Sequence, residues 1–199
     1  MNSVEGFCKT SILEDARHDD GYHDKLEIIA GSEVYLNDFR EVLKENLSSL
    51  NRRNILVVVS MLQELILNQA KLEALYPVIL ELMYKEASYD FSISPRIARV
   101  LIKIRGEDIT VFKDITENTD ESDPVSVSIS VCALYSNYPN FEGIPEATIS
   151  RFLEKVYICL RKNKGCNDLK LAISSNLLPI LQKNDYMGYC GKFSEEGLN

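Results

Sequence analysis

Residues 52–84 read RRNILVVVSMLQELILNQAKLEALYPVILELMY, and this stretch decides the fold class. In its first half, apolar residues recur at spacings of three and four between Ile55 and Ile66, which is the period of one face of an α-helix. Val57 and Met61 fall outside that face, so we expect neighbouring helices to cover this one on several sides. In the second half, Pro77 predicts the first turn of another helix, where its missing N–H costs little.

The composition is that of a globular domain. The chain has 199 residues, of which 45% are hydrophobic and 26% charged, so it is long enough to bury one sizeable core and general disorder is excluded. The net charge of −8 argues against indiscriminate binding to nucleic acid or to anionic lipid, although it allows a local basic face.

The cysteines and the N-terminal sequence predict the compartment. Five cysteines are an odd number, and none forms a Cys-x-x-Cys pair, so we expect reduced thiols in a cytoplasmic or nuclear protein. Glu5, Glu14 and Asp15 lie where a signal peptide would be basic and then apolar, and no uninterrupted apolar run is long enough for a membrane span.

Helix start signals divide the chain. Ser32 predicts a cap for a helix that runs to about residue 48, and Ser94-Pro95 and Asp123-Pro124 each combine a capping side chain with proline at the first helical position. Pro145 predicts one more helix start. We therefore expect a mobile acidic leader over residues 1–31, a single helical domain over 32–183, and a flexible tail over 184–199.

One segment is ambiguous. Residues 125–131 read VSVSISV, an alternation that is also typical of a half-buried strand. We predict a helix because Asp123-Pro124 precedes it, and strand remains the alternative.

A weak internal repeat suggests the architecture. Residues 60–83 align with 157–183 when Leu62 matches Leu160 and the Leu-x-Pro-aliphatic run at 75–78 matches that at 177–180. With Ala133-Leu134-Tyr135-Ser136-Asn137, these segments resemble armadillo/HEAT-type helical repeats. The resemblance implies an all-α, right-handed stack of helical hairpins whose groove holds segments of other proteins through asparagine side chains. By this resemblance Asn137 is the candidate asparagine. Residues 37–104 also resemble the opening helices of MIF4G-type translation-factor domains, and a small armadillo domain of an Hsp70 nucleotide-exchange factor is similar in length.

A basic strip is the candidate interaction site. Residues 96–105 contain four basic and no acidic residues, whereas residues 107–123 contain seven acidic residues and one basic residue. The predicted partner-binding residues are Arg96, Arg99, Lys103, Asn137, Arg151 and Lys155. The alternative is that these cations form an ordinary solvated surface.

The sequence shows no recognisable catalytic or metal-binding motif. The only histidines, His18 and His23, lie with three aspartates in RHDDGYHD, but their spacing matches no defined metal site, so we predict no metal and no cofactor. The sequence has no Gly-x-Ser-x-Gly, phosphate loop or Gly-x-Gly-x-x-Gly motif. A hydrolase that uses Cys159 or Cys166 would require a thiol that is reactive at neutral pH.

The sequence therefore favours a non-enzymatic adaptor or scaffold that binds another protein and has no small-molecule substrate. The alternative function is an RNA- or ribosome-associated translation factor that uses the basic strip, and RNA binding by that strip would weaken steeply with salt.

Overall fold

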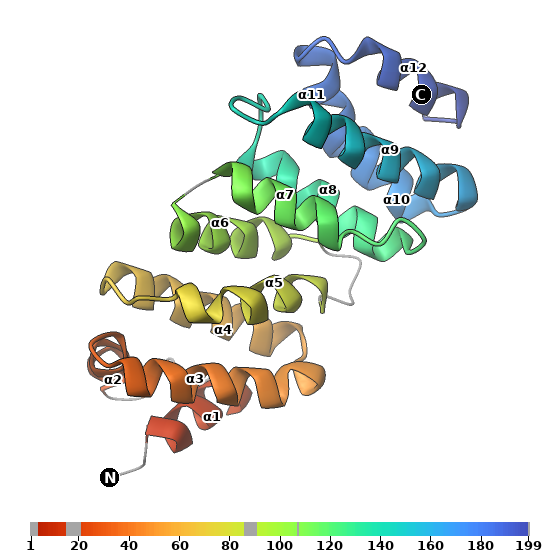
Figure 1. Ribbon diagram of the computed structural model, residues 1–199. Coiled ribbons are helices and arrows are strands. Elements are labelled where there is room, and N and C mark those ends of the chain that lie inside the picture. The colour runs from red at the N-terminus through yellow and green to blue at the C-terminus, as the bar shows by residue number, and fades with distance from the viewer. Residues whose placement is uncertain (1–3, 15–20, 86–90, 107, 199) are drawn as a thin grey trace. The chain divides into compact units, whose positions relative to one another are not determined.

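The computed structural model describes residues 4–14, 21–85, 91–106 and 108–198, and every regular element in these ranges is helical (Figure 1). The all-α prediction is therefore confirmed for the described residues. The helices are α1 (Val4–Glu14), α2 (Tyr22–Ala30), α3 (Glu33–Asn46), α4 (Arg52–Leu67), α5 (Tyr76–Tyr84), α6 (Ser94–Arg105), α7 (Asp108–Asn118), α8 (Pro124–Asn137), α9 (Glu146–Lys162), α10 (Asn167–Ala172), α11 (Leu178–Lys183) and α12 (Met187–Glu195).

The chain divides into two compact units. The first contains residues 1–87 and 100–106, and the second contains residues 88–99 and 107–199. The sequence analysis expected one domain over residues 32–183. The division falls within α6, whose first half belongs to the second unit and whose second half belongs to the first.

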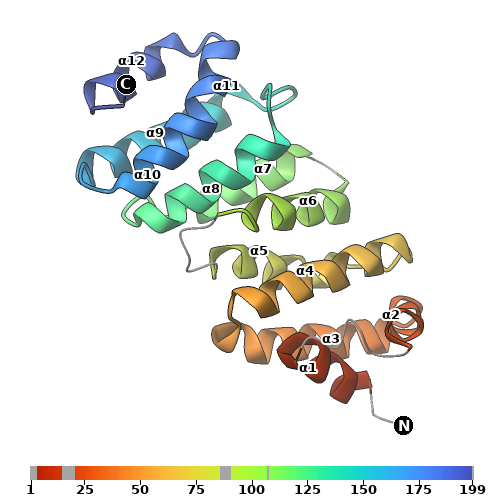
Figure 2. The same cartoon turned by 180° about the vertical axis from the view of Figure 1, so that it is seen from behind.

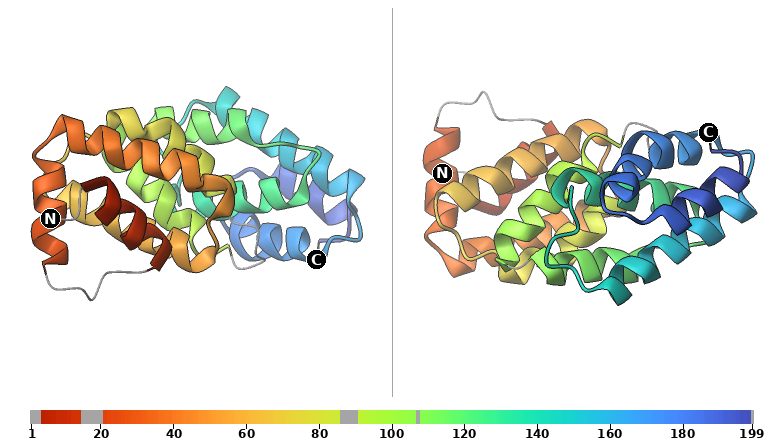
Figure 3. Two further views of the ribbon diagram at one scale, coloured as in Figure 1. Left: turned by 90° about the horizontal axis from the view of Figure 1, so that it is seen from below. Right: turned by 90° about the horizontal axis from the view of Figure 1, so that it is seen from above.

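In the first unit, neighbouring helices cover α4 on several sides, as its apolar breadth predicts. Asn51 caps it: the Asn51 side chain accepts from the Asn54 N–H, and the Asn54 side chain accepts from the Asn51 N–H, both at 3.1 Å. Val57, Val58 and Val59 are all fully buried although they occupy successive positions around the helix. Helices α1 and α2 both pack against α4, and Figure 3 shows them from below and from above.

The N-terminal residues differ from the expected mobile leader. Within residues 4–14 and 21–30, α1 and α2 form and pack against α3 and α4. Cys8, Ile12, Leu26 and Ile29 are fully buried. Acidic residues outnumber basic residues in this segment, but these buried apolar side chains recur at helical spacing, and burying them stabilises the helices against α3 and α4.

Two of the predicted helix starts show different chemistry. The Ser32 hydroxyl accepts from the Tyr35 N–H at 3.4 Å, which confirms Ser32 as the cap of α3. Ser94 instead lies inside the first turn of α6, and its hydroxyl donates to the Phe91 carbonyl at 2.9 Å. Pro77 lies in the first turn of α5, as expected.

In the second unit, α8 resolves the ambiguous segment as helix. Asp123 caps it by accepting from the N–H groups of Val125 and Ser126. The serines that produce the strand-like alternation lie within the helix and are buried: Ser128 donates to Pro124 O and Ser130 donates to Ser126 O. A hydroxyl bonded to the carbonyl four residues earlier can be buried with its donor satisfied. Helices α7, α9 and α10 all contact α8, so apolar and serine positions alike are covered.

The C-terminal residues, which the sequence predicted to be a flexible tail, include a further helix, and their flexibility stays a prediction. Over residues 184–198 the chain forms α12, and Phe193 and Leu198 are buried. Glu196 follows α12 and pairs with two cations of the α9 end: its carboxylate lies 3.6 Å from Arg161 Nε and 2.7 Å from Lys164 Nζ. These contacts hold α12 against α9.

The predicted repeat has a partial structural counterpart. Pro77 and Pro179, which the alignment matches, both lie in the first turn of a helix. In the later segment, however, a five-residue π-helical turn, Ile173–Leu177, joins α10 directly to α11. The right-handed armadillo/HEAT-like stack remains a prediction.

Candidate functional site

The three predicted cations of α6 are exposed. Arg96 and Arg99 belong to the second unit and Lys103 to the first. On the opposite side of the helix, Ile97 and Leu101 are fully buried. The sequence pattern of one apolar and one basic face is therefore present in the structure of α6.

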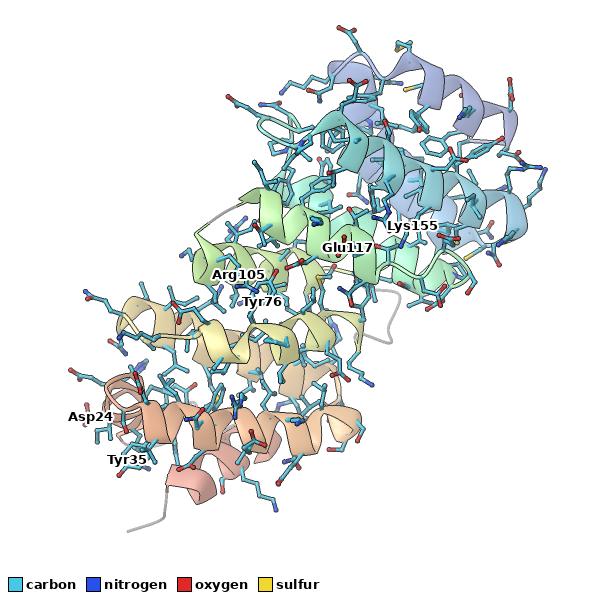
Figure 4. All side chains as sticks on the ribbon, in the orientation of Figure 1. Asp24, Tyr35, Tyr76, Arg105, Glu117 and Lys155 are labelled. Carbon is cyan, nitrogen blue, oxygen red and sulfur yellow. The ribbon has the colours of Figure 1, made fainter. Side chains whose placement is uncertain are left out.

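The two predicted cations of α9 are bound to α7. Lys155 Nζ donates to the Thr119 carbonyl at 2.7 Å and to the Glu117 carbonyl at 3.4 Å, at the point where α7 ends. Arg151 Nη1 lies 3.9 Å from the Glu117 carboxylate. Figure 4 shows Lys155 and Glu117 on these neighbouring helices. Lys155 thus supplies hydrogen bonds to carbonyls that a helix C-terminus leaves without partners.

Asn137 has a similar internal role. Its Nδ2 donates to Ala133 O at 2.8 Å and to Pro95 O at 3.1 Å, so it joins the end of α8 to the first turn of α6. The bond to the carbonyl four residues earlier recurs at other helix ends, at Asn46, Asn118, Asn163 and Asn184. Both amide hydrogens of Asn137 are engaged within the chain, which leaves only its oxygen for a partner.

A groove opens beside Asn137, and all of its lining belongs to the second unit. It has a volume of about 460 Å³ and lies between the start of α6, the second half of α8, and α10 with the π-helical turn. Its apolar lining comes from Phe91, Pro95, Cys132, Leu171 and Ala172. Its polar lining comes from Ser92, Ser136, Asp168 and Asn176. We call it the Leu171 groove. In Figure 2, α8 and α10 lie side by side.

Leu171 is the unusual member of this lining. Its side chain is 63% exposed, whereas Cys132 and Ala172 beneath the groove are 9% and 4% exposed. An isolated exposed leucine is ordinary on a protein surface, but one at the rim of an apolar groove adds to a continuous apolar surface. The groove therefore offers a floor and a rim for an apolar side chain.

The π-helical turn has a local cause. Pro179 has no N–H, so it cannot donate to the Ser175 carbonyl as an α-helix would require. The Leu178 N–H donates to the Ile173 carbonyl, five residues earlier. The wider turn places Asn176 in the groove wall, where its Nδ2 donates to Ala172 O at 2.9 Å and to Cys132 Sγ at 3.6 Å. Such turns occur often at functional sites.

Asp168, Leu171 and Asn176 were not among the site residues predicted from the sequence. Leu171 does not fit the helical spacing of the buried residues Leu169, Ala172 and Ile173. This mismatch was the one feature of the local sequence that indicated an exposed apolar side chain. Phe91 and Cys132, far away in the sequence, complete the groove.

Two of the buried cysteine thiols, Cys8 and Cys159, are poorly suited to nucleophilic chemistry. Burial raises the pKa of Cys159 to about 11, and burial followed by the nearby Asp38 charge raises that of Cys8 to about 12. Cys166 is half-buried. A thiol with a raised pKa holds its proton at neutral pH and is a weak nucleophile.

The histidine-rich segment is only partly within the described residues. His18, Asp19 and Asp20 lie outside them, while His23 is exposed, with Nδ1 3.7 Å from the Glu64 carboxylate. Among the described residues, histidine, cysteine and acidic side chains form no group of three that could hold a metal ion. None of the described helices is long and apolar enough to cross a membrane.

Comparison of the chain with protein-family models, with curated proteins and with solved structures gives no match.

Proposed function

We propose that this chain is a non-enzymatic adaptor that holds a segment of another protein in the Leu171 groove. The main support for this proposal is the exposed Leu171 side chain, which lies at the rim of an open groove of about 460 Å³ with a buried apolar floor. A groove that is open along one side suits a peptide segment, which continues past it, better than a small molecule, which needs enclosure over most of its surface.

The residues predicted to bind a partner have different roles in this proposal. Asn137 holds Pro95, a groove residue, against α8, so it supports the groove wall. Arg99 follows Pro95 by four residues and so shares its face of α6, one turn away. Lys155 and Arg151 are bound to α7. The adaptor function therefore depends on α6, α8 and α10 more than on α9.

The RNA-associated alternative would need cations that reach phosphates. Because Lys155 is bound to helix carbonyls, it contributes less to such a surface than its charge suggests. Partner binding that falls steeply between low and moderate salt would favour RNA, whereas binding to the groove would depend weakly on salt.

The test replaces Leu171 by glutamate and measures binding of peptides selected from a displayed random library on the native protein. We expect Leu171→Glu to weaken binding of the selected peptides at least about tenfold, because a carboxylate replaces apolar contact area. The matched control is Leu67→Glu, since Leu67 is 70% exposed and lies in the first unit.

Circular dichroism and thermal unfolding should be unchanged in both variants, because each site is exposed in the folded chain. If no peptide is enriched, or if Leu67→Glu and Leu171→Glu act equally, the proposed function is wrong.

A further inference from the structure

Two polar side chains of the Leu171 groove, Asp168 and Asn176, can only accept hydrogen bonds from a ligand. Among the described residues, Asp168 is the one charged residue that lines the groove, and its side chain forms no ion pair or hydrogen bond with them. Asn176 uses both donor hydrogens on Ala172 O and Cys132 Sγ, so it presents only its oxygen to the groove. The two groups of fixed polarity are therefore both acceptors.

Asp168 and Leu171 are close enough to act on one ligand. They lie three residues apart on α10, a spacing that places their side chains on one face of a helix. Exposed Arg99, on the α6 side, forms no ion pair with Asp168, and no other cation of the described residues pairs with this carboxylate. An apolar surface thus lies directly beside a negative charge that has no ion-pair partner among the described residues.

We propose that the groove selects a partner segment in which a lysine or arginine stands beside an apolar residue. The apolar side chain packs on Leu171 and the Cys132 floor, and the basic side chain donates to Asp168. This inference rests on the proposed function of the groove. Charge complementarity of this kind fixes which segment binds, because a misplaced carboxylate in the partner would be repelled by Asp168.

The two acceptors also limit the length of the recognised segment. Asp168 and Asn176 are eight residues apart, which is about 12 Å along a helix axis. An extended chain covers that distance in about four residues. We therefore expect recognition to be confined to a short motif: a basic residue, an apolar anchor next to it, and one donor within about four residues.

Asp168 has a competing structural role, since it lies in the first turn of α10, where a negative charge is favourable. Loss of binding in Asp168→Asn alone would therefore be ambiguous. Exchanging the charges of residue 168 and of the peptide removes the ambiguity. If Asp168 only stabilised α10, reversing the charge of the peptide would not restore binding.

The experiment uses the intact protein and peptides selected on it from the displayed random library. We expect the enriched peptides to carry lysine or arginine beside an apolar residue, and Asp168→Asn to weaken their binding at least about tenfold. The same peptides should not bind the Asp168→Lys variant. Peptides in which glutamate replaces the basic residue should bind that variant.

The outcomes separate this inference from the function on which it rests. Peptides that depend on Leu171 but show no basic preference, and no response to Asp168→Asn, would overturn the inference and leave the groove as a peptide site. Failure of the glutamate peptides to bind Asp168→Lys would also overturn it. Failure to enrich any Leu171-dependent peptide would overturn the proposed function as well.

Discussion

Lys155 donates a hydrogen bond of 2.7 Å to the carbonyl oxygen of Thr119, the residue that directly follows α7. This bond joins α9 to the C-terminal end of α7 and uses the charge of a residue that the sequence analysis placed in a partner-binding strip.

Replacing Lys155 by methionine tests its structural role. The change keeps the aliphatic stem and removes the donor, so the carbonyls of Glu117 and Thr119 lose their partner. We expect the free energy of unfolding to fall by about 1–2 kcal/mol in urea denaturation. Lys162→Met is the control, because Lys162 is exposed on the same helix, and it should cost less than about 0.5 kcal/mol. Equal costs in the two variants would contradict the capping role.

Asn54 connects α1 to α4, and its removal should be costlier than loss of a helix cap alone. Its Nδ2 donates to the Ile12 carbonyl at 2.9 Å in the buried interior. Asn54→Ala should destabilise the protein by about 2–3 kcal/mol, because it leaves that carbonyl without a donor as well as weakening the cap. Asn51→Ala, which removes the cap alone, should cost about 1 kcal/mol. Hydrogen exchange should speed up in α1 for Asn54→Ala only.

Arg105 stacks on Tyr76, with its guanidinium carbon 4.1 Å from the ring centre, and Figure 4 shows the two side chains. Arg105→Ala should lower the free energy of unfolding by about 0.5–1 kcal/mol through loss of the cation–π contact. A double-mutant cycle with Tyr76→Leu measures the coupling directly. Lys103→Ala on the same helix is the control and should be nearly neutral, since Lys103 is exposed. A coupling energy of zero would show that the stack contributes nothing.

The cysteines should differ sharply in reactivity. With a pKa of about 11, Cys159 has about one thiolate in a thousand at pH 8, and Cys8 has fewer still. We expect a thiol-alkylating reagent to modify half-buried Cys166 first, as measured by peptide mass mapping, and to reach the buried cysteines only in denaturant. Rapid modification of Cys159 in the native protein would contradict this order.

The same pKa values predict alkaline sensitivity. The folded-state pKa values of Cys8 and Cys159 lie above the ordinary value of 9.0, so on raising the pH the unfolded chain loses these protons first. Their contribution to stability is complete below about pH 9 and falls as the pH rises toward 11–12. A Cys8→Ala/Cys159→Ala variant should therefore show a shallower loss of unfolding free energy between pH 9 and pH 11.

Much of the fold could be predicted because its determinants are local. The three-and-four spacing of apolar residues within 52–84 specifies helices, and a side chain such as Ser32 or Asp123 satisfies N–H groups only a few residues away. The breadth of apolar positions in α4 also indicated that several helices would cover it.

The candidate site could not be predicted in the same way. Lys155 and Arg99 are equally basic in the sequence, yet Lys155 is bound to α7 while Arg99 is exposed, because only packing places a helix end within reach of one of them. The Leu171 groove brings together residues 91–95, 132–136 and 168–176, whose shared surface has no local signature.

The sequence by itself therefore determined the all-α class and many helix ends, since backbone hydrogen bonds and capping act over three or four residues. The tertiary structure alone decided that α1 and α2 pack on α4 and that Lys155 serves as a helix cap. It also decided that Asp168, which has no ion-pair partner among the described residues, lies beside exposed Leu171. These features arise from contacts between distant segments, which depend on how whole helices fit together.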